Sequence, residues 1–285
     1  MRPEGVGAKR PTTASELVVE SWVSIRCMVA FCRLRAPTPP KDYNQVLLSP
    51  SAMPSVRRPA TKGTTMGTAS EPYTEGFVLG TPGLVCRWRL AGGHVVAQGR
   101  HLRALAARRV NGERITPEML AWVRQHLEWT LEPGASGNPE GVLMIIVDDK
   151  GQAAMSVGPY EPLSSLTLPD IFFRANSARE EASKTGVAPE TMWFVSNDHL
   201  ICDIAVGSAA SGTTSLIEDL ARTVGMTVER RSGASDAAQR GLLDFQEAFL
   251  VSDEHGVVPA EGHGGARSAR FKESYEKLCA SKRER

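Results

Sequence analysis

The sequence of 285 residues predicts an α/β or α+β protein built as two lobes. A continuous apolar run, GVLMIIV at 141–147, is typical of a strand that is covered on both faces. The segment 116–131 predicts a helix, because Thr116 can cap it, Pro117 fits its first turn and apolar residues recur at helical spacing. The segment 158–169 has three prolines and no regular period, so we expect the connection between the lobes there.

The first, smaller lobe is expected at residues 76–158 as an α+β unit. Apolar and polar residues alternate in LVCRWRL, 84–90, which predicts a half-buried strand. Gly92-Gly93 then predicts a hairpin turn into a second strand at 94–97. A short helix at 101–109 is expected to follow.

The second lobe is expected at residues 167–265, followed by a C-terminal helix at 266–285. Strand and helix patterns alternate through it, which is the pattern of an α/β or α+β lobe. The expected elements are helices at 176–185, 213–224 and 235–243, strands at 191–195, 200–206 and 227–231, and a strand, turn and strand at 247–260.

Residues 1–70 are expected to be a disordered or non-core extension and linker. The part from 36 to 65 is dense in Pro, Ser, Thr and basic residues and has no sustained period. An apolar stretch at 17–34 precedes it, but Glu20 and Arg26 interrupt it and it is barely long enough to cross a bilayer. We therefore expect neither a signal peptide nor a transmembrane helix.

The charge balance and the cysteines narrow the class of function. The 33 basic and 32 acidic residues leave a net charge of +1, so neither nucleic acid nor an anionic membrane is expected as the main partner. The 5 cysteines never form a CxxC pair, which argues against a disulfide framework and a thiolate zinc site and favours the cytoplasm. The histidines share no metal spacing, so no metal is assigned. A small-molecule or protein partner is expected.

A glycine-bounded loop at 207–212 lies between a predicted strand and a predicted helix, an order that points free backbone N–H groups at a phosphate. Thr213 stands where a P-loop has its lysine, so a nucleotide triphosphatase is not expected, although a P-loop-like nucleotide binder stays a distant alternative. The simpler interpretation is a helix start with a Ser or Thr cap.

The segment 247–260 is predicted to be a strand, turn and strand that lines a small-molecule site. Its turn carries Ser252, Asp253, Glu254 and His255. These neighbours are not a catalytic triad, because triad members converge from separate elements. The simpler interpretation is a solvated turn.

Three motifs resemble the class IV aminotransferases, the fold-type IV pyridoxal-phosphate enzymes that include branched-chain aminotransferases and 4-amino-4-deoxychorismate lyases. They are WRLAGGHVVAQGRHLRAL at 88–105, SGTTSLIEDLARTVGMTVERR at 211–231 and EAFLVSDEHGVVPAEG at 247–262. The resemblance runs from about Gly76 to the C-terminus. It implies a two-lobed, partly shortened member of that fold, pyridoxal 5'-phosphate as cofactor, an amino acid or aminodeoxychorismate-like ligand, and a homodimer.

The resemblance also implies roles for single residues, and several depart from the family pattern. Thr167, in TLPDI, stands at the position of the Schiff-base lysine, and a threonine cannot form an aldimine. Ala104 stands at the phosphate-binding arginine, and Arg103 beside it is the candidate replacement. Asp203 stands at the glutamate that pairs with the pyridine nitrogen.

The remaining cofactor-binding candidates belong to the phosphate end of the implied site. Gly212, Thr213 and Thr214 form the implied phosphate loop, and Ser252 and Asp253 form the last active-site turn. A carboxylate about 4 Å from a phosphate dianion costs on the order of 1 kcal/mol even in water.

Two hypotheses follow. The first is pyridoxal-phosphate-dependent transamination or lyase chemistry on an amino acid, with no catalytic residue assigned because the lysine is lost. The alternative is a pseudoenzyme that acts as a dimeric ligand-binding or regulatory protein.

Overall fold

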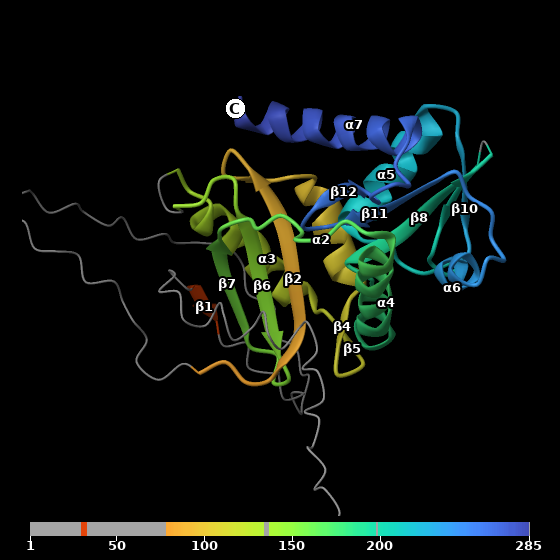
Figure 1. The fold of residues 1–285 in the computed structure, drawn as a ribbon. Coiled ribbons are helices and arrows are strands. Elements are labelled where there is room, and N and C mark those ends of the chain that lie inside the picture. The colour runs from red at the N-terminus through yellow and green to blue at the C-terminus, as the bar shows by residue number, and fades with distance from the viewer. Residues whose placement is uncertain (1–29, 33–77, 134–136, 198, 285) are drawn as a thin grey trace, which may run out of the picture.

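The structure, a computed structural model, describes residues 30–32, 78–133, 137–197 and 199–284 (Figure 1). Most of the predicted extension at 1–70 lies outside these residues, as does the apolar stretch at 17–34 apart from three residues. Within the described part, two five-stranded sheets form two α+β lobes. No helix among the described residues is long and apolar enough to span a membrane.

The first sheet is antiparallel throughout, with the strand order β1-β7-β6-β2-β3. Its core joins alternate residues of β2 to the two long helices of the lobe, and Leu84, Cys86, Trp88 and Leu90 all point into it. The elements are β1 (Ala30–Cys32), β2 (Pro82–Ala91), β3 (His94–Val95), α2 (Gln98–Ala107), β4 (Arg109–Val110), β5 (Glu113–Arg114), α3 (Pro117–Thr130), β6 (Val142–Asp148) and β7 (Ala153–Gly158).

The second sheet has the order β10-β9-β8-β11-β12, in which only β9 and β10 run parallel. Helices α5 and α7 cover one face through Trp193 and Phe249, and α4 and α6 cover the other through Phe194 and Leu250. The elements are α4 (Leu168–Thr185), β8 (Glu190–Ser196), β9 (His199–Cys202), α5 (Gly212–Thr223), β10 (Thr227–Arg230), α6 (Ala234–Gln239), β11 (Glu247–Ser252), β12 (Gly256–Pro259) and α7 (Ala266–Arg283).

Several boundaries differ from the sequence-based expectation: α2 begins at Gln98 instead of residue 101, α6 ends at Gln239 instead of residue 243, and β3 ends at Val95 instead of residue 97. Two further differences have a clear physical reason. Helix α4 begins at Leu168 instead of residue 176, because Thr167 caps it and Pro169 fits the first turn, where a missing N–H is harmless. The strand expected at 200–206 ends at Cys202, and the carboxylate of the next residue, Asp203, accepts the Gly233 N–H at the start of α6. The hairpin turn is as expected, with positive φ at Gly92 and Gly93.

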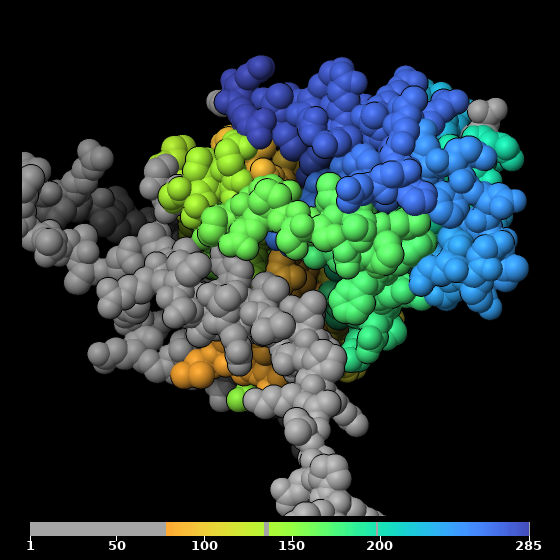
Figure 2. Space-filling model, in the orientation of Figure 1, coloured from red at the N-terminus to blue at the C-terminus, as the bar shows by residue number. Residues whose placement is uncertain are grey.

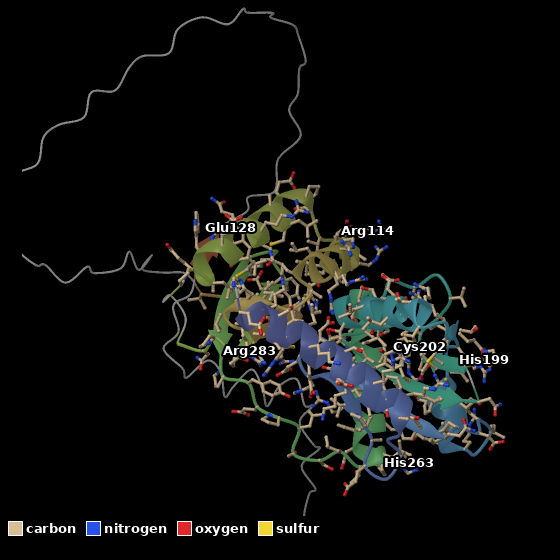
Figure 3. The ribbon with its side chains drawn as sticks, turned by 90° about the horizontal axis from the view of Figure 1, so that it is seen from above. Arg114, Glu128, His199, Cys202, His263 and Arg283 are labelled. Atoms are coloured by element: carbon tan, nitrogen blue, oxygen red, sulfur yellow. The ribbon has the colours of Figure 1, made fainter. Side chains whose placement is uncertain are left out.

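Helix α7 lies across the top of both lobes, as the space-filling view shows (Figure 2). Viewed from above, it runs from the second lobe to Arg283, beside the first (Figure 3). The Arg283 guanidinium binds Glu140 of the first lobe, with its Nε 2.9 Å from Oε2. A Cβ placed on Gly92 would lie 2.7 Å from the Arg283 Cα, so the helix end sits directly on the β2–β3 turn.

Strand β12 also makes a close contact with α7, at its first residue, Gly256. Its φ is +71°, and an added Cβ would lie 2.3 Å from Cε1 of the Tyr275 ring. We expect Gly256→Ala to lower the free energy of unfolding by roughly 2–4 kcal/mol, because a left-handed backbone and a clash with α7 add together.

Gly262→Ala is the matched control, because Gly262 has a φ of +72° and nothing within 4 Å of the added Cβ. It should lose only about 1–2 kcal/mol, the backbone part alone. Urea unfolding of the two variants measures the difference. Equal losses would show that the Tyr275 contact adds nothing.

Candidate functional site

A cavity of about 460 Å3 lies where β2, α4, the start of β8 and the β11–β12 turn meet. We call it the interlobe cavity. Its wall is of mixed character and carries several charged side chains, among them Arg87 from β2, Arg174 and Glu181 from α4, Glu190 from β8 and Glu254 from the turn. Among the described residues that line it there is no lysine.

Asp253 lies at the inner end of this cavity and is only 3% exposed. Its Oδ1 accepts a hydrogen bond of 2.9 Å from the Thr213 N–H, at the N-terminus of α5. Its Oδ2 lies 3.6 Å from Nδ1 of His101, an ion-pair distance that is too long for a hydrogen bond. A helix N-terminus favours an anion, and here the chain's own carboxylate is that anion.

The environment of Asp253 keeps it ionised. Burial alone would raise its pKa, but the adjacent His101 ring and the Thr213 N–H outweigh burial, so the pKa lies below its ordinary value. His101 is itself buried and stacks on Trp88 at a centroid distance of 5.1 Å. The carboxylate therefore has a fixed, pre-organised setting.

The implied phosphate loop is assembled at this point, and its donors are already used. The N–H of Thr213 binds Asp253, and the N–H of Thr214 binds the Ser211 hydroxyl at 3.2 Å. A Cβ on Gly212 would lie 2.3 Å from His101 Nδ1, so only glycine fits beside that ring. These two N–H groups are therefore not free to bind the phosphate of a cofactor or of a nucleotide.

Arg103 does not reach the site. It lies on the exposed face of α2, whereas Ala104 is buried. The cation that the sequence reading missed is Arg108, four residues after Ala104, which is 2% exposed and binds Glu181 with 3.2 Å between Nη1 and Oε1. The only signal for it in the sequence is this spacing of one helical turn.

Thr167 and Asp203 lie away from the interlobe cavity and serve as helix caps. The Thr167 hydroxyl accepts from the Asp170 N–H at the exposed start of α4. The Asp203 carboxylate accepts from three backbone N–H groups at the start of α6, at 2.7 Å from Gly233, which precedes the helix, 3.2 Å from Ala234 and 3.0 Å from Ser235. The structure thus brings together Gly212, Thr213, Thr214, Ser252 and Asp253, and leaves Thr167, Arg103 and Asp203 elsewhere.

Ser252 takes part in a chain of polar contacts and is no free nucleophile. Its hydroxyl donates to Glu190 Oε1 at 2.8 Å, and the same oxygen lies 2.6 Å from Arg174 Nη2. The hydroxyl also accepts from the N–H groups of Glu254 and His255. These bonds fix the turn between β11 and β12.

Four more titratable groups near this cavity have shifted pKa values. Burial raises the pKa of both Glu181 and Glu254, and it raises the pKa of the Cys86 thiol to about 11. Burial and the nearby Arg174, Arg89 and Arg87 lower the pKa of His255 to about 3. The Cys86 thiol is therefore protonated and His255 is neutral at pH 7. Among the described residues, no group of three side chains that could ligate a metal ion lies together.

No protein-family model matches the chain, and no curated protein matches it significantly. Among solved structures, a hypothetical aminotransferase from Mycobacterium tuberculosis in its PLP-bound form matches with 14% identity, 73% of this chain, 96% of that chain and a TM-score of 0.49. The fold IV transaminase CpuTA1 from Curtobacterium pusillum matches with 14% identity and a TM-score of 0.48, and the match covers 70% of this chain and 84% of that one. The branched-chain amino acid aminotransferase from Escherichia coli matches with 14% identity and a TM-score of 0.46, and the match covers 73% of this chain and 90% of that one.

The lowered pKa of His255 has a measurable consequence. Below about pH 6.5 the unfolded chain takes up a proton that the folded chain refuses, so stability falls by up to about 1.4 kcal/mol per pH unit until pH 3 is approached. We expect His255→Gln to reduce the loss of stability between pH 7 and pH 5 by up to about 2 kcal/mol.

Urea unfolding at the two pH values measures this difference. His199→Gln is the matched control, because His199 lies exposed at the start of β9 (Figure 3). It should leave the wild-type difference in place. If His255→Gln also leaves it in place, His255 does not carry the acid sensitivity.

Proposed function

We propose that this chain is a catalytically silent member of the fold-type IV aminotransferase group, which binds a small anionic ligand without forming a Schiff base. The observation that carries the proposal is the Asp253 carboxylate at the N-terminus of α5, where the motif resemblance puts the cofactor phosphate. We further propose that it acts as a cytoplasmic homodimer, as the resemblance implies.

Pyridoxal phosphate is the cofactor that the resemblance implies, and it needs three things from a protein: a cradle for its phosphate, an amine for the aldimine and an acid beside the ring nitrogen. The place for the phosphate is already occupied, because Asp253 and His101 fill the start of α5. A phosphate dianion about 4 Å from the carboxylate would be destabilised by on the order of 1 kcal/mol or more.

The second and third requirements are not met by the described residues either. None of the described side chains that line the interlobe cavity carries a primary amine, and Thr167 caps α4. The carboxylate of Asp203, which the resemblance implies as the partner of the pyridine nitrogen, instead accepts hydrogen bonds from three N–H groups at the start of α6. These residues do not fit the covalently bound cofactor, and we derive no catalytic step through it.

The alternative is a working enzyme that performs transamination or lyase chemistry on an amino acid or aminodeoxychorismate-like substrate. It requires a lysine amine that reaches the interlobe cavity. On the proposal made here, pyridoxal phosphate added to the full-length protein gives no new visible absorbance band and no borohydride-reducible adduct on any lysine. A reduced pyridoxyl adduct found by mass spectrometry would decide for the enzyme.

A second test concerns the anion cradle itself. Asp253→Ser should free the Thr213 N–H and remove the buried charge, so inorganic phosphate should bind at least about tenfold more tightly than to the wild type. The readout is the rise in thermal stability with phosphate concentration, since a ligand of the folded state stabilises it.

Asp219→Ser is the matched control, because Asp219 is a half-exposed carboxylate on the same helix, away from its N-terminus. Asp253→Ala, which also frees the Thr213 N–H and removes the charge, replaces the serine variant if that one folds poorly. Equal gains for the Asp219 and Asp253 variants would mean that the effect is general charge and that the cradle is not involved.

A further inference from the structure

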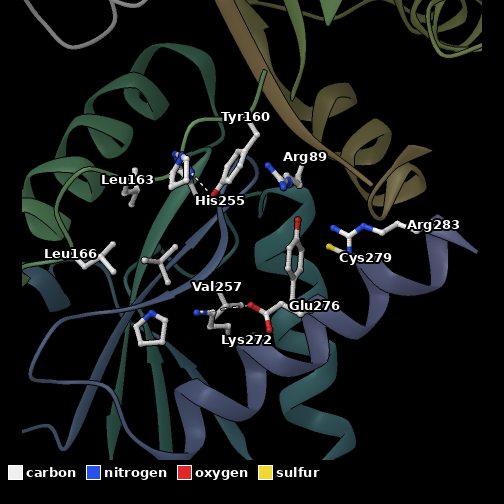
Figure 4. A pocket seen from close by; sticks show the side chains of 14 residues that line it. Arg89, Tyr160, Leu163, Leu166, His255, Val257, Lys272, Glu276, Cys279 and Arg283 are labelled. Atoms are coloured by element: carbon white, nitrogen blue, oxygen red, sulfur yellow. Dashed lines mark hydrogen bonds and ion pairs between the residues drawn. The ribbon is translucent and has the colours of Figure 1, made fainter. Parts of the chain in front are cut away.

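A second cavity, of about 580 Å3, lies beside the interlobe cavity and is bounded by α7, β12 and the connection between the lobes (Figure 4). We call it the α7 cavity. Tyr160 and His255 stand at its edge, with 3.4 Å between the Tyr160 hydroxyl and His255 Nδ1. Its volume lies within the range of about 300–1,000 Å3 that is usual for small-molecule sites. Asp253, Thr213 and the rest of the α5 cradle do not line it.

Arg89 supplies the charge in this cavity. Its guanidinium stacks on the Tyr160 ring at 3.4 Å, and its backbone N–H donates to the Asp253 carbonyl at 3.1 Å, so both ends are held. Its Nη1 is buried and has no hydrogen-bond partner among the described residues. A buried guanidinium nitrogen that lacks an acceptor is an arrangement that favours an incoming anion.

Tyr275 supplies a second donor from α7. The residue is 6% exposed and lines the cavity, and its hydroxyl is buried without a hydrogen-bond partner among the described residues. Burial raises its pKa well above the ordinary value, so the hydroxyl keeps its proton. The ring rests against Gly256, where a Cβ would lie 2.3 Å from Cε1. The hydroxyl is thus held in place with a proton to donate.

The other charges of the cavity wall are already paired. Lys272 lies 3.9 Å from Glu276, and Arg283 binds Glu140. His255 is neutral at pH 7, since its pKa is lowered to about 3. Arg89 is therefore the charge in this wall without a carboxylate partner in the described residues. The remaining wall is apolar, formed by Leu163, Leu166, Val257, Val258 and Pro259.

We infer that the α7 cavity binds a monocarboxylate with a short apolar chain, whose carboxylate lies between Arg89 and the Tyr275 hydroxyl and whose chain lies along the Leu163 and Val257 side. One negative charge matches the one guanidinium of this wall that has no carboxylate partner in the described residues, and the apolar wall favours a carbon chain over a second charged group. This inference rests on the proposed function in that it names the ligand class, but it concerns a cavity separate from the implied cofactor cradle.

The test is calorimetric titration of the full-length protein with sodium hexanoate and, as a neutral analogue of the same size, hexanamide. We expect saturable hexanoate binding to the wild type and at least about tenfold weaker binding of hexanamide. Arg89→Gln should weaken hexanoate binding at least about tenfold, and Tyr275→Phe, which keeps the ring, about fivefold. Arg124→Gln, at an exposed arginine of α3, should leave it unchanged.

Three results would overturn the inference: no saturable hexanoate binding, equal binding of hexanamide, or an Arg124 variant as weak as the Arg89 variant. If Arg89→Gln folds poorly, the isosteric Tyr275→Phe variant decides, and unchanged binding there counts against the site. A lysine adduct with pyridoxal phosphate would contradict the proposed function, but it would not change the result of the hexanoate titration. If hexanoate does not bind, only the inference about the α7 cavity fails.

Discussion

The buried Asp253 is the constraint on which the arrangement of the two lobes depends. Its N–H donates to the carbonyl of Pro189 and its carbonyl accepts from the N–H of Arg89, each at 3.1 Å. Its carboxylate binds the Thr213 N–H and faces His101. One residue therefore ties strand β2, helix α2, the start of β8 and helix α5 together. A buried charge is tolerable only when it is so fully surrounded by partners, which is why the His101 ring and the Gly212 backbone are packed against it.

Much of the fold could be predicted from local patterns. The apolar run at 141–147 is β6, the capped pattern at 116–131 is α3, and the segment 247–260 is the antiparallel pair β11 and β12. Each depends on interactions between near neighbours in the chain, which periodicity and capping residues record directly. The start of α4 was missed because Pro169 looks like a loop residue when it is in fact the first turn of a helix.

The site could be predicted only in part, because a motif gives a residue type and a position but not the partner that a side chain chooses. Gly212, Thr213 and Asp253 are brought together as the motifs suggest. Asp203 instead accepts hydrogen bonds at the start of α6, and the buried cation near the site is Arg108 and not Arg103. Both choices depend on residues far away in the chain, Gly233 and Glu181, and no local pattern records such contacts.

Helix α7 has a consequence for how any ligand is selected. It packs on β12 through Tyr275 and on the first lobe through Arg283, and both contacts are close. A hinge motion that widened the space between the lobes would first have to lift this helix from one of them. We therefore expect the protein to behave as a rigid receptor, in which the size of a guest decides its entry and lobe closure contributes little.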